Sequence, residues 1–230
     1  IEFDLTLTDA AISLGDEPSA RVDARYLFGA PAADLAVEGE LRLRTTRTLA
    51  AHAGYLFGRH DERFDTRTVY FDPVRTNSLG EAQLVLAMPE LDEIPSQPLE
   101  LALTARVAEG SGRPVERVRN RPLTNQAAMI GVKPKFDGVL SEGAEAQFDV
   151  ISTTEKMPVR WTLNKIETRY QWYQNGGGWE WEPIIRRIRI ASGEMTLTDV
   201  PTVLAQPTTW GQFELVVVRT DAPYTVSSVS

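Results

Sequence analysis

The chain of 230 residues contains no cysteine and only two histidines. The absence of cysteine excludes disulfide bonds, zinc sites with cysteine ligands and thiol nucleophiles from this sequence. It does not identify the compartment, because exported proteins can also lack cysteine. Long hydrophobic runs and polybasic clusters are absent too, so we predict no membrane contact by this chain.

Positively charged residues are also fewer than negatively charged ones. The sequence has 24 lysine and arginine residues against 32 aspartate and glutamate residues, a net charge of −8. Phosphate backbones require a positive protein surface, so a nucleic-acid partner is excluded. The length suits one large or two ordinary domains. Both ends of the sequence have strand-like patterns, and we therefore expect the chain to be an excised fragment of a longer protein.

The clearest pattern in the sequence lies in Ala20–Thr46, where two alternating runs flank Gly29 and Pro31. Alternation with a period of two is typical of half-buried antiparallel strands, not of helices. The apolar side is predicted to contain Val22, Ala24, Tyr26, Phe28, Val37, Gly39, Leu41, Leu43 and Thr45. The water-facing side is predicted to contain Arg21, Asp23, Arg25, Glu38, Glu40, Arg42 and Arg44.

Similar short runs recur along the whole chain, about seven in each half, and no amphipathic helix pattern occurs. This arrangement predicts an all-β fold of two tandem seven-stranded antiparallel β-sandwich domains. The polar, aperiodic stretch Asn120–Ala128 places the domains at residues 1–124 and 125–230. In the second half, the alternation predicts that Ile188 and Ile190 point inward.

The residues that most often perform catalysis do not form a convincing pattern. His52 and His60 have Asp61, Glu62 and Asp65 nearby, but the intervening segment is irregular. A metal site would need these ligands on one rigid face, so we predict that both histidines are solvated surface residues. Serine-hydrolase, P-loop and dinucleotide motifs are also absent. We therefore predict no catalytic, metal or cofactor-binding residues and no enzyme activity.

An aromatic hairpin is the best candidate for a role beyond the core. The stretch 170–181 reads as two strands around three consecutive glycines, with aromatic side chains on both strands. Alternation places Tyr170 with Trp172 and Trp179 with Trp181, so cross-strand aromatic pairs are expected. Three roles remain open at this point: structural packing, contact with another domain, and binding of a ligand such as a carbohydrate.

Several segments resemble those of one protein family, the bacterial alpha-2-macroglobulins. A Tyr-x-x-Gly-x-Pro strand followed by a Val-x-Gly-x-Leu strand is similar to the pattern of its macroglobulin domains. The similar segments, in order along the chain, are Tyr26–Glu40, Gly54–Gly58, Asn77–Ala82, Gly112–Val115, Tyr170–Pro183 and Thr209–Gly211.

This resemblance implies two consecutive macroglobulin domains, which are fibronectin-III-like sandwiches. It also implies a scaffold role in a large periplasmic or extracellular protease trap of a family whose members are often lipid-anchored. Neighbouring macroglobulin domains and, through the whole protein, target proteases would be the partners. The covalent step of such traps uses a thioester in Cys-x-Glu-Gln, which this sequence lacks, and no bait segment is obvious. The alternative is an adhesin-type cell-surface module that binds through its loops or the hairpin around Trp179.

Overall fold

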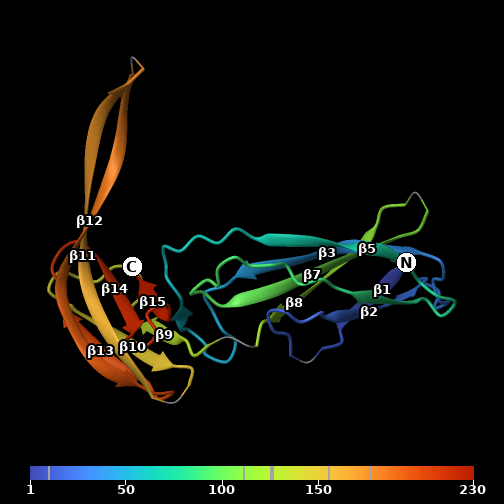
Figure 1. Ribbon diagram of the computed structural model, residues 1–230, viewed down its shortest axis with the longest axis horizontal. Coiled ribbons are helices and arrows are strands. Elements are labelled where there is room, and N and C mark those ends of the chain that lie inside the picture. The colour runs from blue at the N-terminus through green and yellow to red at the C-terminus, as the bar shows by residue number, and fades with distance from the viewer. Residues whose placement is uncertain (10, 111, 125–126, 155, 177) are drawn as a thin grey trace. The chain divides into compact units, whose positions relative to one another are not determined.

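The computed structural model describes residues 1–230 except 10, 111, 125–126, 155 and 177. The described residues form strands and loops without a helix, which confirms the all-β prediction, and they contain no helix that could span a membrane. They group into two compact units (Figure 1). The first unit comprises Ile1–Thr46 and Arg63–Gln126, and the second comprises Arg47–Glu62 and Ala127–Ser230. The predicted domains are continuous in sequence, whereas Arg47–Glu62 lies in the second unit.

The first unit is a sandwich of a three-stranded and a four-stranded antiparallel sheet. The smaller sheet has the order β1 (Glu2–Leu7), β2 (Ser19–Arg25) and β6 (Glu81–Val85). The larger sheet has the order β5 (Arg67–Arg75), β3 (Ala36–Thr45), β7 (Leu99–Ala108) and β8 (Val115–Pro122).

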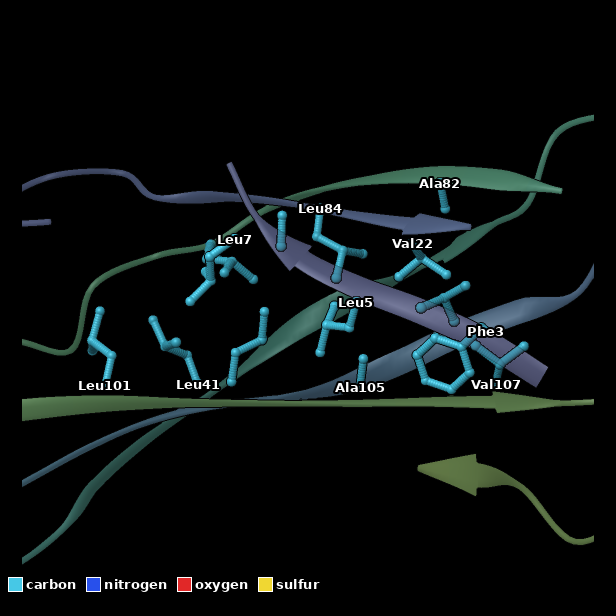
Figure 2. Close-up of a cluster of buried hydrophobic side chains, with 14 of the residues drawn as sticks. Phe3, Leu5, Leu7, Val22, Leu41, Ala82, Leu84, Leu101, Ala105 and Val107 are labelled. Carbon is cyan, nitrogen blue, oxygen red and sulfur yellow. The ribbon is translucent and has the colours of Figure 1, made fainter. Parts of the chain in front are cut away.

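The core of the first unit lies between these two sheets. Figure 2 shows Phe3, Leu5 and Val22 of the smaller sheet facing side chains of the larger one. Alternation therefore predicted the buried face of β2 and β3 correctly, with one exception. Phe28 is 81% exposed, because β2 ends at Arg25 and the chain turns there, with the Gly29 amide donating to the Tyr26 carbonyl.

Glu40 is the main departure from alternation in this unit. It was predicted on the water-facing side of β3 but is only 3% exposed. The Arg106 guanidinium donates to its carboxylate at 2.9 Å, and Arg42 donates at 2.6 Å. The bond from Arg106 holds the pKa of Glu40 below its usual value, despite the opposing effect of burial. A buried carboxylate is tolerated when it is paired in this way.

The second unit is built from two four-stranded antiparallel sheets. One sheet has the order β13 (Thr202–Pro207), β10 (Glu145–Ser152), β9 (Ile130–Pro134) and β4 (Leu56–Phe57). The other has the order β12 (Gly178–Leu197), β11 (Met157–Asn175), β14 (Gln212–Arg219) and β15 (Val226–Val229). Buried side chains from both sheets, including Phe148 and Trp161, form a separate core.

The stretch predicted as an interdomain boundary is partly ordered into the first unit. β8 continues to Pro122, which is paired with Glu100. The next two amides donate to carbonyls of the same unit, Leu123 to Leu99 and Thr124 to Ile12. Asn125 and Gln126, where the second predicted domain begins, lie outside the described residues.

We predict that Gly39→Ala destabilises the first unit. Gly39 lies at a bulge of β3, and a Cβ there would overlap the carbonyl oxygen of Thr104 on β7. Because the obstacle is backbone, the expected loss in the free energy of unfolding is about 1–3 kcal/mol or more. Urea unfolding followed by amide hydrogen exchange measures it. Glu38→Ala on the same strand is exposed and should change stability by less than about 0.5 kcal/mol; equal effects would contradict the steric explanation.

Candidate interaction site

The second unit carries a long hairpin, and among the described residues no third strand pairs with its outer part. β11 and β12 pair from Met157 and Leu197 to Asn175 and Gly178, but β14 pairs with β11 only as far as Ile166. Residues 167–175 and 178–186 are called the arm below. Within its own unit, the arm projects from the sandwich (Figure 1). A two-stranded ribbon of this kind is marginally stable by itself in water.

One face of the arm is aromatic, as the sequence predicted. Trp172 is paired directly with Trp181, and the rings of Tyr170 and Trp181 meet edge-to-face with centroids 5.3 Å apart. The expected cross-strand pairing is therefore present. The exposed fractions are 62% for Tyr170, 62% for Trp172, 70% for Trp179 and 55% for Trp181. The described residues of the second unit leave these four side chains largely in contact with water.

The opposite face of the arm is charged. Its members by strand alternation are Glu167, Arg169, Gln171, Tyr173, Glu180, Glu182, Ile184 and Arg186. Tyr173 donates its hydroxyl to Glu180 at 3.1 Å, and this hydrogen bond raises the pKa of Tyr173. The arm is thus amphipathic, and a ribbon with a contiguous exposed apolar face is typical of an interaction surface.

The polarity of β11 reverses where the arm begins. In the sandwich, the odd-numbered residues Val159, Trp161 and Leu163 are buried in the core. Further out, the odd-numbered positions are charged or polar, whereas the even-numbered Tyr170 and Trp172 are aromatic. The aromatic face therefore lies on the side of the sheet that points away from the core of its own unit. It is not an extension of that core.

The predicted inward orientation of Ile190 is wrong. The register of β11 and β12 shifts at Leu163 and Asn164, so that Ile190 is an extra, unpaired residue. Such a bulge breaks the alternation on which the prediction rested. Ile190 is 50% exposed, and Ile188 is half-buried.

Near the base of the arm, residues 47–62 lie along one edge of the second unit. These residues, called the inserted segment below, include β4, which pairs with β9 through Leu56 and Phe57. The hydroxyl of Ser227 on β15 accepts from the Gly58 amide at 2.8 Å and donates to the Ile130 carbonyl at 2.5 Å. The sequence does not identify β4, because a strand of two residues has no measurable periodicity.

His60 is not the solvated surface residue that was predicted. Its amide donates to the Ser228 hydroxyl at 3.0 Å, and its ring Nδ1 lies 2.7 Å from the same oxygen. The ring Nε2 lies 3.8 Å from Glu214. His52 is half-buried too, with its ring 5.8 Å from that of Phe57.

This serine, histidine and carboxylate cluster has a structural arrangement, not a catalytic one. Ser228 is 2% exposed and already accepts the His60 amide, so its oxygen cannot reach a substrate. Glu214, 2% exposed, also accepts from Arg187 at 3.0 Å and from Asn164 at 3.2 Å. Within the described ranges, no group of three or more histidine, aspartate and glutamate side chains is placed to hold a metal ion.

Arg187 connects the arm to the inserted segment. Its guanidinium donates to Asp61 at 3.1 Å as well as to Glu214. Arg59 also donates to Asp61, at 3.0 Å. The bond from Arg59 holds the pKa of the Asp61 carboxyl below its usual value, against the opposing effect of burial. Ion pairs thus hold the inserted segment at the base of the arm.

Two family models match the chain in succession. The Bacterial Alpha-2-macroglobulin MG5 domain matches residues 1–124, and Bacterial macroglobulin domain 6 matches residues 131–230. The alpha-2-macroglobulin of Xylella fastidiosa strain 9a5c is 27% identical over 208 residues, covering 84% of this chain and 12% of that protein. The alpha-2-macroglobulin of Escherichia coli K12 is 24% identical over 248 residues, covering 93% and 14%.

Solved structures share the fold. A crystal structure of Salmonella alpha-2-macroglobulin reacted with methylamine has a TM-score of 0.78 and 24% identity, covering 99% of this chain and 16% of that one. Escherichia coli alpha-2-macroglobulin activated by porcine elastase has a TM-score of 0.73 and 25% identity, covering 99% and 21%. The chain thus spans less than a quarter of the length of each of these proteins.

We predict that Asp61→Asn destabilises the second unit in a pH-dependent way. A carboxyl whose pKa is lowered by folding stabilises the fold fully above its unfolded value of about 3.9, and this contribution is lost as the pH falls through the folded pKa. The stability difference between the native chain and Asp61→Asn should be fully present at pH 6 and decrease as the pH falls below about 4. Urea unfolding followed by tryptophan fluorescence measures it, because all five tryptophans lie in the second unit.

The control for this measurement is Glu194→Gln, which removes a carboxylate from an exposed pair with Arg160 in the same unit. Surface pairs of this kind contribute at most about 1 kcal/mol. A difference between the native chain and Asp61→Asn that stays constant from pH 6 to pH 3 would show that the carboxylate charge does not hold the inserted segment.

Proposed function

The chain belongs to the bacterial alpha-2-macroglobulin family, and from this premise we propose that it is a non-catalytic scaffold of a broad-spectrum protease trap. Two macroglobulin modules in succession, matched end to end by the family models, carry this proposal. In the longer protein, a protease would cut a bait segment elsewhere and a thioester would capture it. This chain has no cysteine to form that thioester. Its part is to hold other domains in place.

The description of the Escherichia coli relative as activated by elastase supports proteases as partners of the longer protein. The periplasm or the cell exterior is the corresponding location, since proteases from outside would be met there. The chemistry of the described residues is compatible with a scaffold: its one serine–histidine contact is buried and engaged in fastening the inserted segment.

We further propose that the aromatic face of the arm contacts a neighbouring domain of the same polypeptide. Tyr170, Trp172, Trp179 and Trp181 would lie at the centre of this contact. Burying an aromatic side chain removes about 150–250 Å² from water, so four partly exposed rings offer on the order of 500 Å². A stable complex of separate proteins buries about 800 Å² on each partner. The face is therefore too small to hold a second copy firmly.

A tethered partner needs less contact area. Domains joined in one chain meet at an effective concentration near the millimolar range, so a small interface suffices. The relatives are several times longer than this chain, which supports further domains as partners. The alternative, an adhesin-type module binding a ligand around Trp179, is not favoured by the family relationship, but the same experiment distinguishes it.

We predict that the arm is more protected in the longer protein than in this chain alone. Amide exchange of residues 167–186 should slow by about tenfold or more when the neighbouring domain is present, because docking closes the ribbon's aromatic face. Trp172→Ser with Trp181→Ser should abolish the added protection. The same pair of substitutions in the chain alone should leave the unfolding of the sandwich unchanged, since both side chains are exposed.

The matched control is Glu167→Ala with Arg169→Ala, which alters the charged face of the same ribbon and should leave the protection in place. Equal exchange rates in the chain and in the longer protein would contradict the docking proposal. Quenching of the chain's tryptophan fluorescence by oligosaccharides, lost in the serine double variant, would instead support the binding-module alternative.

A further inference from the structure

The inserted segment joins both sheets of the second unit along one edge of the sandwich. On one side, β4 pairs with Gly131 and Val132 of β9. On the other, the carbonyl of Gly58 accepts the Ser228 amide of β15 at 3.1 Å. The segment therefore continues the hydrogen bonding of two sheets that would otherwise both end there.

Phe57 packs against a position of β9 that has no side chain. It is fully buried, and Gly131 faces it without a side chain. A Cβ at Gly131 would lie 3.0 Å from the Phe57 ring and 2.9 Å from Ile151. A larger residue at this position would therefore require the Phe57 or Ile151 side chain to shift. Residues from the second half of the chain are shaped around a side chain from the first half.

Arg47 secures the start of the inserted segment through the backbone. Its guanidinium donates to the carbonyls of Ser228 at 2.6 Å, Gly58 at 3.2 Å and Phe57 at 3.4 Å. Burial lowers the pKa of Arg47. The three carbonyl bonds compensate for the water that its guanidinium loses. At the other end of the segment, His60 and Asp61 bind Ser228 and Arg187.

Removal of the segment would take away hydrogen bonds from several polar groups of the second unit. The Gly58 amide binds Ser227, the Arg47 guanidinium binds the Ser228 carbonyl, and Asp61 binds Arg187. Buried groups that lose such bonds are strongly unfavourable. The exposed edges of β9 and β15 would also become available for pairing with other strands.

We propose that the seam between β9 and β15 is a strand-acceptor groove, and that its partner is the segment Arg47–Glu62 of the same chain. The second macroglobulin module is complete only with this segment, although the matching family models assign residues 1–124 to the first module. The second module therefore requires part of the sequence that the family model assigns to the first module. This inference does not depend on the proposed protease-trap function, because it concerns only contacts within the second unit.

The first test uses the intact chain and Phe57→Ala. All five tryptophans lie in the second unit, so tryptophan fluorescence reports its unfolding alone. Loss of a buried phenylalanine should lower the urea midpoint of this transition by about 1 M or more. Phe28→Ala is the matched control, since Phe28 lies in the same half of the sequence but is 81% exposed and belongs to the first unit. It should leave the tryptophan transition unchanged.

Leu84→Ala is the converse substitution, which perturbs the first unit and not the second. Leu84 is buried in the core of the first unit, so this substitution should increase amide exchange in residues 63–124 without moving the tryptophan midpoint. A tryptophan midpoint that is unaffected by Phe57→Ala would overturn the proposal, because the second unit would then not depend on the inserted segment.

The second test cuts the chain between Thr124 and Ala127 at an introduced protease site. The two fragments should remain together in gel filtration, since residues 47–62 of the first fragment stay bound in the groove of the second. A variant with residues 49–61 replaced by a Gly/Ser linker of equal length should either release the fragments or lose the native tryptophan spectrum. Retention of both association and spectrum in this variant would overturn the proposal.

Discussion

A β-sandwich is stable in water only when its sheets cover each other's apolar faces and its strand edges are paired or protected. The second unit meets this requirement at one edge with residues that interrupt the sequence of the first unit. β4 extends one sheet, Gly58 hydrogen-bonds to the other, and the buried Phe57 packs against Gly131 and Ile151. The position of Arg47–Glu62 in the sequence therefore does not indicate which sandwich it completes.

Each unit contains a buried carboxylate that is paired with an arginine. Glu40 and Glu214 lie on strands at positions where alternation places water-facing residues, and both are almost fully buried. Each accepts from an arginine on another strand, Arg106 for Glu40 and Arg187 for Glu214. A carboxylate in this setting is stable only with its partners, so each pair fixes which strands lie together. The pairing, not the pattern of the single strand, decides the burial.

The sequence was sufficient for features that depend on near neighbours. Alternation along β2 and β3 predicted the strands and their buried faces, and alternation around three glycines predicted the aromatic hairpin. Alternation did not predict features that depend on residues far apart in the sequence. A strand as short as Leu56–Phe57 has no period, and its identity depends on β9, more than 70 residues away by numbering. Ile190 was misplaced because a bulge is set by the pairing of two strands, which one strand's pattern does not contain.

The apolar side chains of a β-sandwich must be covered, and the arm and the inserted segment differ in where this cover comes from. The inserted segment packs the buried side chain of Phe57 against Gly131 and Ile151 of its own unit. The arm presents four aromatic side chains on the side of β11 that points away from the core, and its charged face lies where the core would have to be. No rearrangement that keeps this register can turn Trp172 and Trp181 toward the sandwich, because a strand fixes the face of every second residue. Closure of the aromatic face must therefore come from outside the second unit, which is what a docking contact supplies.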